Sequence, residues 1–261
     1  MRVLLGGLWT TILGLPLLVI IYTRYAYGLV RARLGRLDVL DRALEANAQL
    51  AGWVSQVLWT SVLLALAGIR LRVRELKPID WTRAHVICAN HASLFDILAL
   101  IRSVPPPFRF VAKRELLSWP IVGWALRPAG QIVIDRADHN KAIRSIAEAA
   151  VHKIRGQVIF FVEGTRSRTG ELLPFKKGAF HFAIENRLPI LPTAIRGSYA
   201  ILAKLPWWRI QPGRSIEISF CPEIDAAGGI VDVLLEQTRT AIAGVLEPES
   251  VSSQQSAVGG L

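Results

Sequence analysis

The chain has 261 residues, of which 52% are hydrophobic and 20% are charged, and its formal net charge is +11. This composition is more apolar than that of an average soluble domain and favours one globular domain with an apolar appendage. The positive charge suits either nucleic acid or an anionic lipid surface. The basic residues flank apolar segments or strand ends and do not follow a stripe of stacking aromatics. The pattern therefore argues against a nucleic-acid-binding protein.

Two segments without charged residues lie near the N-terminus, Val3 to Tyr22 and Ala48 to Ile69. Each is about long enough for a membrane helix. The first is longer than the usual apolar core of a signal peptide, which favours membrane attachment over cleavage. A basic cluster follows each segment, so two full crossings would leave one cluster outside, against the positive-inside tendency. We expect residues 1–69 to form a hydrophobic two-helix membrane anchor, in which one segment crosses or both dip into one leaflet.

From residue 70 the pattern changes to short stretches rich in β-branched and aromatic residues, which alternate with helical candidates. The expected strands are 71–75, 84–89, 108–112, 130–134, 157–162, 190–195 and 215–220. The expected helices are 139–154, 177–187 and 231–246. This alternation predicts an α/β domain over 70–248, with a mixed, largely buried sheet flanked by helices. Residues 249–261 are small and polar, and we expect them to be disordered.

The two cysteines, Cys88 and Cys221, are far apart in sequence and lie in apolar, strand-like contexts. We interpret them as buried free thiols and not as a disulfide framework. Free thiols are typical of a reducing compartment, which agrees with a catalytic side that faces the cytoplasm.

The stretch "NHASLFD", from Asn90 to Asp96, lies where an apolar strand pattern gives way to a helical one. Sites of open α/β sheets lie at the carboxyl ends of strands. Across the turn, Asp96 can contact a ring nitrogen of His91 and stabilise the imidazolium once it takes a proton. Such a pair suits a general base that acts on a substrate hydroxyl. From this motif alone, a structural turn with Asp96 as a helix cap is about equally favoured.

A second group of polar residues follows another expected strand, in "FVEGTRSRTG". Arg166 and Arg168 offer guanidinium forks suited to a phosphate. Thr165 and Ser167 add hydroxyl donors, and Glu163 is interpreted as an orienting partner for Arg166. Further basic residues lie at other strand or helix ends: Lys113 and Arg114 in "VAKREL", Arg136 in "GQIVIDR", and Lys176 and Lys177 in "LPFKKGAF". Each loop alone fits a solvated surface, but four of them at strand ends favour an anion site.

In the order and type of these residues the sequence resembles the glycerolipid acyltransferase family, specifically the bacterial 1-acyl-sn-glycerol-3-phosphate acyltransferases. The family's NHxxxxD motif is matched by Asn90, His91 and Asp96, and its FxEGTRS block by Phe161 and Glu163 to Ser167. The second block is matched by "KREL" (113–116) together with "GQIVIDR" (130–136), and the fourth, a proline-bearing apolar strand, by "LPILPTAI" (188–195). Four blocks in order make a specific signal, whereas HxxxxD alone would be weak.

The resemblance implies that His91 is the base, that Asp96 is its partner, and that Arg166 and Lys113 hold the acceptor phosphate. The full set of substrate-binding residues that we expect is Asn90, Lys113, Arg114, Glu163, Gly164, Thr165, Arg166, Ser167 and Lys176. Family members use an acyl thioester of coenzyme A or acyl carrier protein and need no metal or other cofactor. Ala92 and Val162 depart from the usual pattern, but neither departure removes a chemical group.

The expected function is acyl transfer to the sn-2 hydroxyl of lysophosphatidic acid at the cytoplasmic (inner) membrane, with the catalytic domain facing the cytoplasm. The expected partners are a lysophospholipid acceptor, the acyl thioester donor and the lipid surface. Two alternatives remain open at this point. The acceptor could be another lysolipid, such as a lyso-ornithine lipid, or the chain could be a non-catalytic membrane-bound lipid-binding protein.

Overall fold

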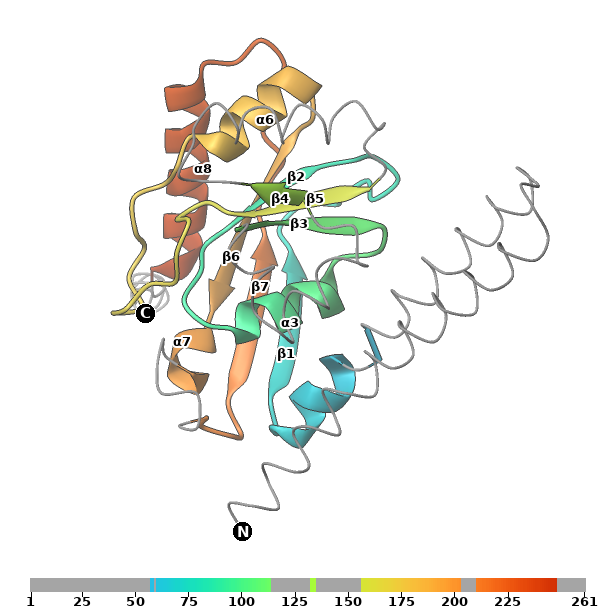
Figure 1. Cartoon of the computed structure of the whole chain (residues 1–261), viewed down its shortest axis with the longest axis vertical. Helices are drawn as coiled ribbons and strands as arrows, with labels where there is room; N and C mark the ends of the chain where they lie inside the picture. The colour runs from blue at the N-terminus through green and yellow to red at the C-terminus, as the bar shows by residue number, and fades with distance from the viewer. Residues whose placement is uncertain (1–56, 59, 114–131, 135–155, 203–209, 248–261) are drawn as a thin grey trace, which may run out of the picture.

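The computed structural model describes residues 57–58, 60–113, 132–134, 156–202 and 210–247. Seven strands of this part form one sheet in the order β1-β7-β6-β2-β5-β3-β4 (Figure 1). The strands are β1 (Arg70–Glu75), β2 (Val86–Ala89), β3 (Phe108–Lys113), β4 (Ile132–Ile134), β5 (Gln157–Phe161), β6 (Ile190–Arg196) and β7 (Ser215–Phe220). Each stretch that the sequence predicts as a strand therefore contains one, although β2 begins only at Val86 and residues 130–131 lie outside the described residues.

The sheet is mixed, as the sequence predicts. β2 pairs in parallel with both β5 and β6, β3 pairs in parallel with β4 and β5, and β7 pairs in parallel with β1. β6 and β7 are antiparallel. All four residues of β2 are buried, which explains why "VICA" is continuously apolar and does not alternate. The turn that follows β2 thus leaves the centre of the sheet.

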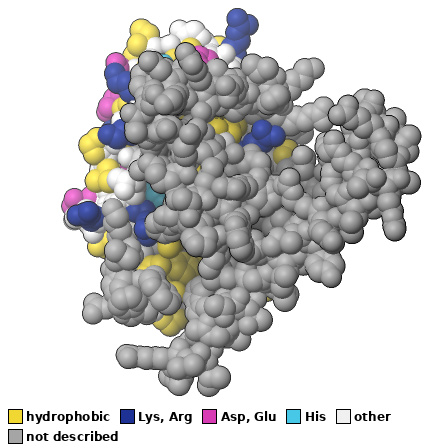
Figure 2. Space-filling view, in the orientation of Figure 1, with side chains coloured by type: hydrophobic (Ala, Val, Ile, Leu, Met, Phe, Trp, Pro, Cys, Tyr) yellow, Lys and Arg dark blue, Asp and Glu magenta, His cyan; other side chains and the backbone are white. Residues whose placement is uncertain are grey.

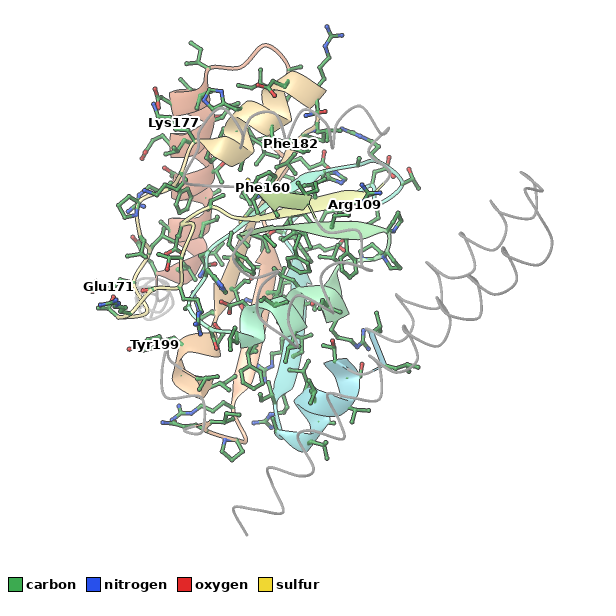
Figure 3. All side chains as sticks on the ribbon, viewed as in Figure 1. Arg109, Phe160, Glu171, Lys177, Phe182 and Tyr199 are labelled. Carbon is green, nitrogen blue, oxygen red and sulfur yellow. The ribbon has the colours of Figure 1, made fainter. Side chains whose placement is uncertain are left out.

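Helices cover both faces of the sheet. The labelled helices within the described residues are α3 (Phe95–Ser103), α6 (Gly178–Asn186), α7 (Ser198–Ile201) and α8 (Val231–Leu246). One core cluster joins α6 and α8 to the sheet, and a second joins α3 to the opposite face. Phe160 of β5 and Phe182 of α6 point toward one another in the first cluster, with ring centroids 5.4 Å apart (Figure 3).

The predicted helices at 177–187 and 231–246 are confirmed as α6 and α8. In α8 the buried residues are Leu234, Thr238 and Ile242, spaced four apart, so one stripe of the helix faces the sheet. α7 was not predicted, because four residues are too few to show a helical period. The helix expected at 139–154 lies outside the described residues.

Most of the predicted anchor at 1–69 and the whole tail at 249–261 lie outside the described residues. The described end of this predicted segment is helical at 57–58 and over 60–66. Leu64 of this helix is buried in the cluster under α3, whereas Leu58, Val62 and Leu66 are 62%, 50% and 61% exposed. Among the residues described, the structure contains no helix with the length and apolarity that a bilayer crossing requires.

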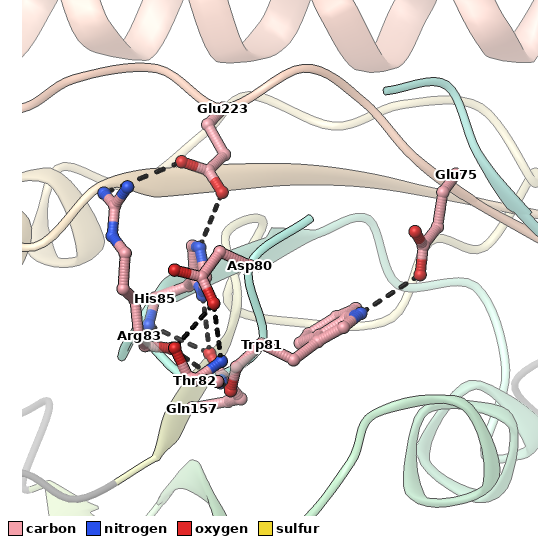
Figure 4. Close-up of polar contacts among 8 residues, drawn as sticks. All are labelled: Glu75, Asp80, Trp81, Thr82, Arg83, His85, Gln157 and Glu223. Carbon is pink, nitrogen blue, oxygen red and sulfur yellow. Dashed lines mark hydrogen bonds and ion pairs between the residues drawn. The ribbon is translucent and has the colours of Figure 1, made fainter. Parts of the chain in front are cut away.

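The N-terminal end of β2 is held by a buried histidine network (Figure 4). Gln157 donates its side-chain amide to the carbonyl of Arg83 at 2.9 Å, so its Oε1 faces His85, where it accepts the backbone N–H at 2.9 Å. Nδ1 of His85 is 3.0 Å from the same Oε1, and Nε2 is 2.8 Å from Oε1 of Glu223. Both ring nitrogens therefore face oxygen acceptors, and His85 has a structural role at this end of β2.

Charged side chains of both signs lie close together along the left edge of the molecule in Figure 2. Lys177, which directly precedes α6 and is labelled in Figure 3, forms an ion pair with Asp232 of α8 at 2.7 Å. Both side chains are more than half exposed, so the pair adds little to stability. Lys177, which the sequence places beside an anion site, is thus paired with a carboxylate of the fold. The cysteines Cys88 and Cys221 are buried free thiols, as predicted.

Candidate active site

The turn between β2 and α3 lies at the carboxyl edge of β2 and is fastened to β6 by Asn90. The Asn90 side chain donates to the carbonyl of Ile195 at 3.0 Å and accepts the N–H of the same residue at 2.7 Å. Asn90 is 5% exposed, and its amide takes the place of a strand partner at the point where β2 ends. This geometry favours a structural role for Asn90 over the substrate contact that the sequence predicts.

Asp96 lies in the first turn of α3, and one of its carboxylate oxygens binds three groups of the preceding β2–α3 turn. Its Oδ2 accepts hydrogen bonds from Nδ1 of His91 and from the backbone N–H groups of Ala92 and Ser93, each at 2.8 Å. Asp96 is therefore the partner of His91 that the sequence predicts, and it also binds the backbone of the turn. It does not cap α3, because the N-cap residue is Leu94 and no side chain makes a cap hydrogen bond there. Because Nδ1 donates to a carboxylate, Nε2 carries the lone pair, and it is the nitrogen available as a base.

The His91–Asp96 pair is almost closed to solvent. The Asp96 side chain is fully buried and the His91 side chain is 12% exposed. Oδ1 of Asp96 is buried without a hydrogen-bond partner among the residues described. The buried carboxylate is thus positioned to stabilise a positive charge on the imidazole after proton uptake.

The loop after β5 holds the backbone of His91 from the other side. Oε1 of Glu163 accepts the backbone N–H of His91 at 2.7 Å, and Oε2 accepts that of Leu173 at 3.0 Å. The N–H of Ser167 donates to the carbonyl of His91 at 2.7 Å. The sequence predicts Glu163 as a partner for Arg166, but the structure shows it binding two backbone amides. The predicted sites at "NHASLFD" and "EGTRS" therefore meet at one residue.

Burial raises the pKa of Glu163 to about 7, and the nearby Asp96 carboxylate adds to this rise. The backbone hydrogen bonds from His91 and Leu173 and the charge of Arg239 oppose it. Glu163 is 3% exposed, so the cost of removing its charge from water outweighs the hydrogen bonds that it accepts.

The remaining predicted residues are placed unevenly. Gly164 makes the turn after β5 in the left-handed region, with φ of +73°. Burial lowers the pKa of Arg166, and the Asp96 carboxylate opposes that shift, so this arginine is electrostatically coupled to the His91–Asp96 pair. Thr165 and Lys176 are exposed. Lys113 ends β3, and Arg114 lies outside the described residues.

Two contacts of this site could not be predicted from the pattern of residues along the chain. The ring of Phe161 lies against the imidazole of His91, and the hydroxyl of Ser167 accepts the N–H of Gly170 at 3.0 Å. Ser167, predicted as a substrate donor, is 1% exposed and is bound within the loop. The match of Phe161 to the FxEGTRS block is the only sequence signal that singles it out.

The chain is similar in sequence to known acyltransferases. A family model described as "Acyltransferase" matches residues 70–196. An uncharacterized acyltransferase of Schizosaccharomyces pombe is 32% identical over 231 residues, which cover 85% of this chain and 78% of that protein. The 1-acyl-sn-glycerol-3-phosphate acyltransferase of Cocos nucifera is 45% identical over 120 residues, which cover 45% of this chain and only 39% of that protein.

A solved structure has the same overall architecture. The crystal structure of the 1-acyl-sn-glycerophosphate (LPA) acyltransferase PlsC from Thermotoga maritima superposes with a TM-score of 0.68 at 26% sequence identity. The superposition covers 94% of this chain and 96% of that one. The family model and these relatives agree, and the match to the fission yeast protein extends over most of both chains. The chain belongs to the glycerolipid acyltransferase family.

Proposed function

We propose that the protein is a 1-acyl-sn-glycerol-3-phosphate acyltransferase, which converts lysophosphatidic acid to phosphatidic acid. The observation that carries the proposal is the 2.8 Å hydrogen bond between Nδ1 of His91 and Oδ2 of Asp96, which leaves Nε2 as a base. The names of the coconut and Thermotoga relatives, which specify this activity, support the choice of acceptor.

In the proposed reaction, Nε2 of His91 takes the proton of the sn-2 hydroxyl as the oxygen attacks the thioester carbonyl. The tetrahedral intermediate then breaks its C–S bond, and His91 returns the proton to the leaving thiolate. Asp96 stabilises the imidazolium between these steps. No covalent enzyme intermediate forms. These proposed reaction steps use no metal and no cofactor beyond the donor thioester of coenzyme A or acyl carrier protein.

Recognition of the acceptor phosphate is assigned to the loop after β5. Arg166 is half-buried and lies in the loop whose neighbouring residues, Glu163 and Ser167, bind the backbone of His91. A guanidinium in this position can bind a phosphate bidentately at a fixed distance from the base. Lys113, the last residue of β3, and Arg114, which follows it in the sequence and lies outside the described residues, are proposed as further phosphate ligands.

The reaction is proposed to take place at the cytoplasmic face of the inner membrane, with residues 1–69 as the anchor. Leu58, Val62 and Leu66 support this proposal, because they are exposed at a spacing of four residues and so share one face of a helix. Exposed apolar stripes of this kind are typical of surfaces that contact lipid. Replacing these three side chains by glutamine should reduce the fraction of protein that floats with anionic lipid vesicles in a density gradient.

The proposed activity is tested by acyl transfer from a long-chain acyl thioester to lysophosphatidic acid in detergent micelles. The wild type is compared with His91→Ala and with His181→Ala, an exposed histidine of α6 that serves as the matched control. We expect activity in the wild type and the control and none in His91→Ala. Coenzyme A and carrier-protein donors are assayed in parallel. A wild type that is inactive toward lysophosphatidic acid, but active toward a lyso-ornithine lipid, would change the acceptor and keep the reaction class.

The role of Arg166 is tested by Arg166→Ala against Arg168→Ala, an exposed arginine two residues further on. We expect Arg166→Ala to raise KM for lysophosphatidic acid by about 10- to 100-fold, the range for loss of a charge-assisted pair of about 1.5–3 kcal/mol. KM for the donor should stay unchanged. Equal effects of the two substitutions would show that the loop contributes only general positive charge.

A further inference from the structure

The imidazole of His91 is stacked on an aromatic ring. The ring centroids of His91 and Phe161 are 3.9 Å apart, and the two planes are inclined by only 17°. Phe161 is also stacked with Phe110 of β3, at 6.1 Å and 20°. The three rings are therefore close to parallel, and the imidazole of the base is at one end of this group.

The register of the sheet brings these rings together. Phe161 is the last residue of β5 and pairs with Ala89, the last residue of β2. Paired residues of neighbouring strands point to the same face, and side chains two positions apart along a strand share that face. His91, two positions beyond Ala89, thus leaves the sheet on the face that carries Phe161. Both Ala89 and Phe161 contact the core cluster on the α3 side, in agreement with this geometry.

The stack supplies a constraint that the hydrogen bond to Asp96 cannot supply alone. A single bond at Nδ1 fixes one atom of the ring but permits the ring to tilt about the direction of that bond. Tilting would move Nε2, which is on the far side of the ring. A second flat ring at 3.9 Å fixes the plane as well. It also excludes water from one face of the imidazole and stabilises the imidazolium through the electron-rich ring face.

We propose that Phe161 is a positioning residue for the acyl transfer: its ring fixes the plane of the His91 imidazole and so the direction of Nε2. The proposal rests on the proposed function, because it assigns His91 as the base. Phe161 is given no contact with substrate. If it acted only by filling space in the core, an aliphatic residue of similar size would serve equally well.

The kinetic test uses Phe161→Leu, which keeps apolar volume but removes the ring, and Phe161→Tyr, which keeps the ring. Phe160→Leu is the matched control, because Phe160 is the neighbouring residue of β5 and contacts Phe182 in the opposite core cluster, with the two rings tilted by 53°. For Phe161→Leu we expect kcat to fall about tenfold, the effect of losing one aromatic pair, with KM for both substrates unchanged. Phe161→Tyr should restore most of kcat, and Phe160→Leu should keep it.

An NMR measurement detects the stacking of His91 on Phe161 independently of enzyme activity. In protein with ¹³C-labelled histidine, the ring C–H protons of His91 should lie upfield because they are above the Phe161 ring, and their signals are identified by their loss in His91→Ala. They should move downfield in Phe161→Leu and stay in place in Phe160→Leu. Unchanged proton shifts in Phe161→Leu would overturn the proposal, as would an unchanged kcat or a change confined to KM. If the wild type proves inactive toward lysophosphatidic acid, the proposed function fails, and the proton shifts alone decide whether Phe161 holds the ring.

Discussion

Replacement of Glu163 by glutamine should separate the structural role of this side chain from the cost of its charge. Oε1 and Oε2 of Glu163 accept one backbone N–H each, from His91 at 2.7 Å and from Leu173 at 3.0 Å. Glutamine has a single acceptor oxygen, so its NH₂ group must face one of these N–H donors. A buried donor left without an acceptor costs about 1–3 kcal/mol.

The charge of Glu163 acts in the opposite direction, and its effect depends on pH. The unfolded chain releases the Glu163 proton near the ordinary pKa of 4.5, whereas burial raises the pKa in the fold to about 7. Between these two values the folded protein holds a proton that the unfolded chain has lost. Its stability therefore falls as pH rises through this window and levels off above about 7. The difference between the two pKa values corresponds to about 3 kcal/mol.

The assay is thermal unfolding of the wild type and Glu163→Gln at pH 5, 6, 7 and 8, with acyl transfer measured at pH 8. Between pH 5 and pH 8 the wild type should lose about 2–3 kcal/mol relative to the variant, or about 4–12 °C in melting temperature. Glu171→Gln, an exposed residue of the same loop (Figure 3), is the control and should show no such change. Activity of Glu163→Gln should fall at least tenfold, because the His91 backbone loses an anchor. A stability difference that is independent of pH would refute the reasoning.

Three further outcomes are expected. Asp96→Asn should lower kcat by about 10²- to 10⁴-fold, because an amide at this position no longer selects the tautomer with the proton on Nδ1, and steady-state kinetics would detect it. Gly197→Ala should unfold at a markedly lower temperature than Gly213→Ala, although both glycines have positive φ. A Cβ added at position 197 would lie 2.3 Å from the carbonyl oxygen of Ser215, whereas a Cβ added at position 213 would meet nothing within 4 Å. Burial raises the pKa of both thiols, so alkylation at pH 8 should label Cys88 and Cys221 only after denaturation.

The pattern of side chains along the chain predicts the sheet well, because burial acts on every residue of a strand or helix. β2 is a run of four apolar residues since both of its faces are covered, and the buried positions of α8 repeat every four residues. The pair of His91 and Asp96 is predictable for a related reason. Its two members are five positions apart across a single turn, so local geometry alone brings them into contact.

Contacts between distant segments could not be predicted in this way. Glu163 lies 72 positions from His91, and its partner is a backbone N–H, which every residue except proline carries. Asn90 binds the backbone of Ile195 over 105 positions. The stack of Phe161 on His91 depends on the register of β2 against β5, and the register appears in neither strand's own pattern. In each case the sequence identifies the polar or aromatic residue, but the strand pairing selects its partner.

These long-range contacts make the base and the proposed phosphate ligand parts of one unit. The loop after β5 contributes the carboxylate of Glu163 and the N–H of Ser167 to the backbone of His91, one on each side of Arg166 in the chain. The guanidinium and Nε2 thus belong to two loops that are hydrogen-bonded directly to each other, and these bonds limit the distance between the two groups. A phosphate bound by Arg166 would place the glycerol backbone at a defined distance from the base. Proximity of this kind is a main source of rate enhancement in reactions between two substrates.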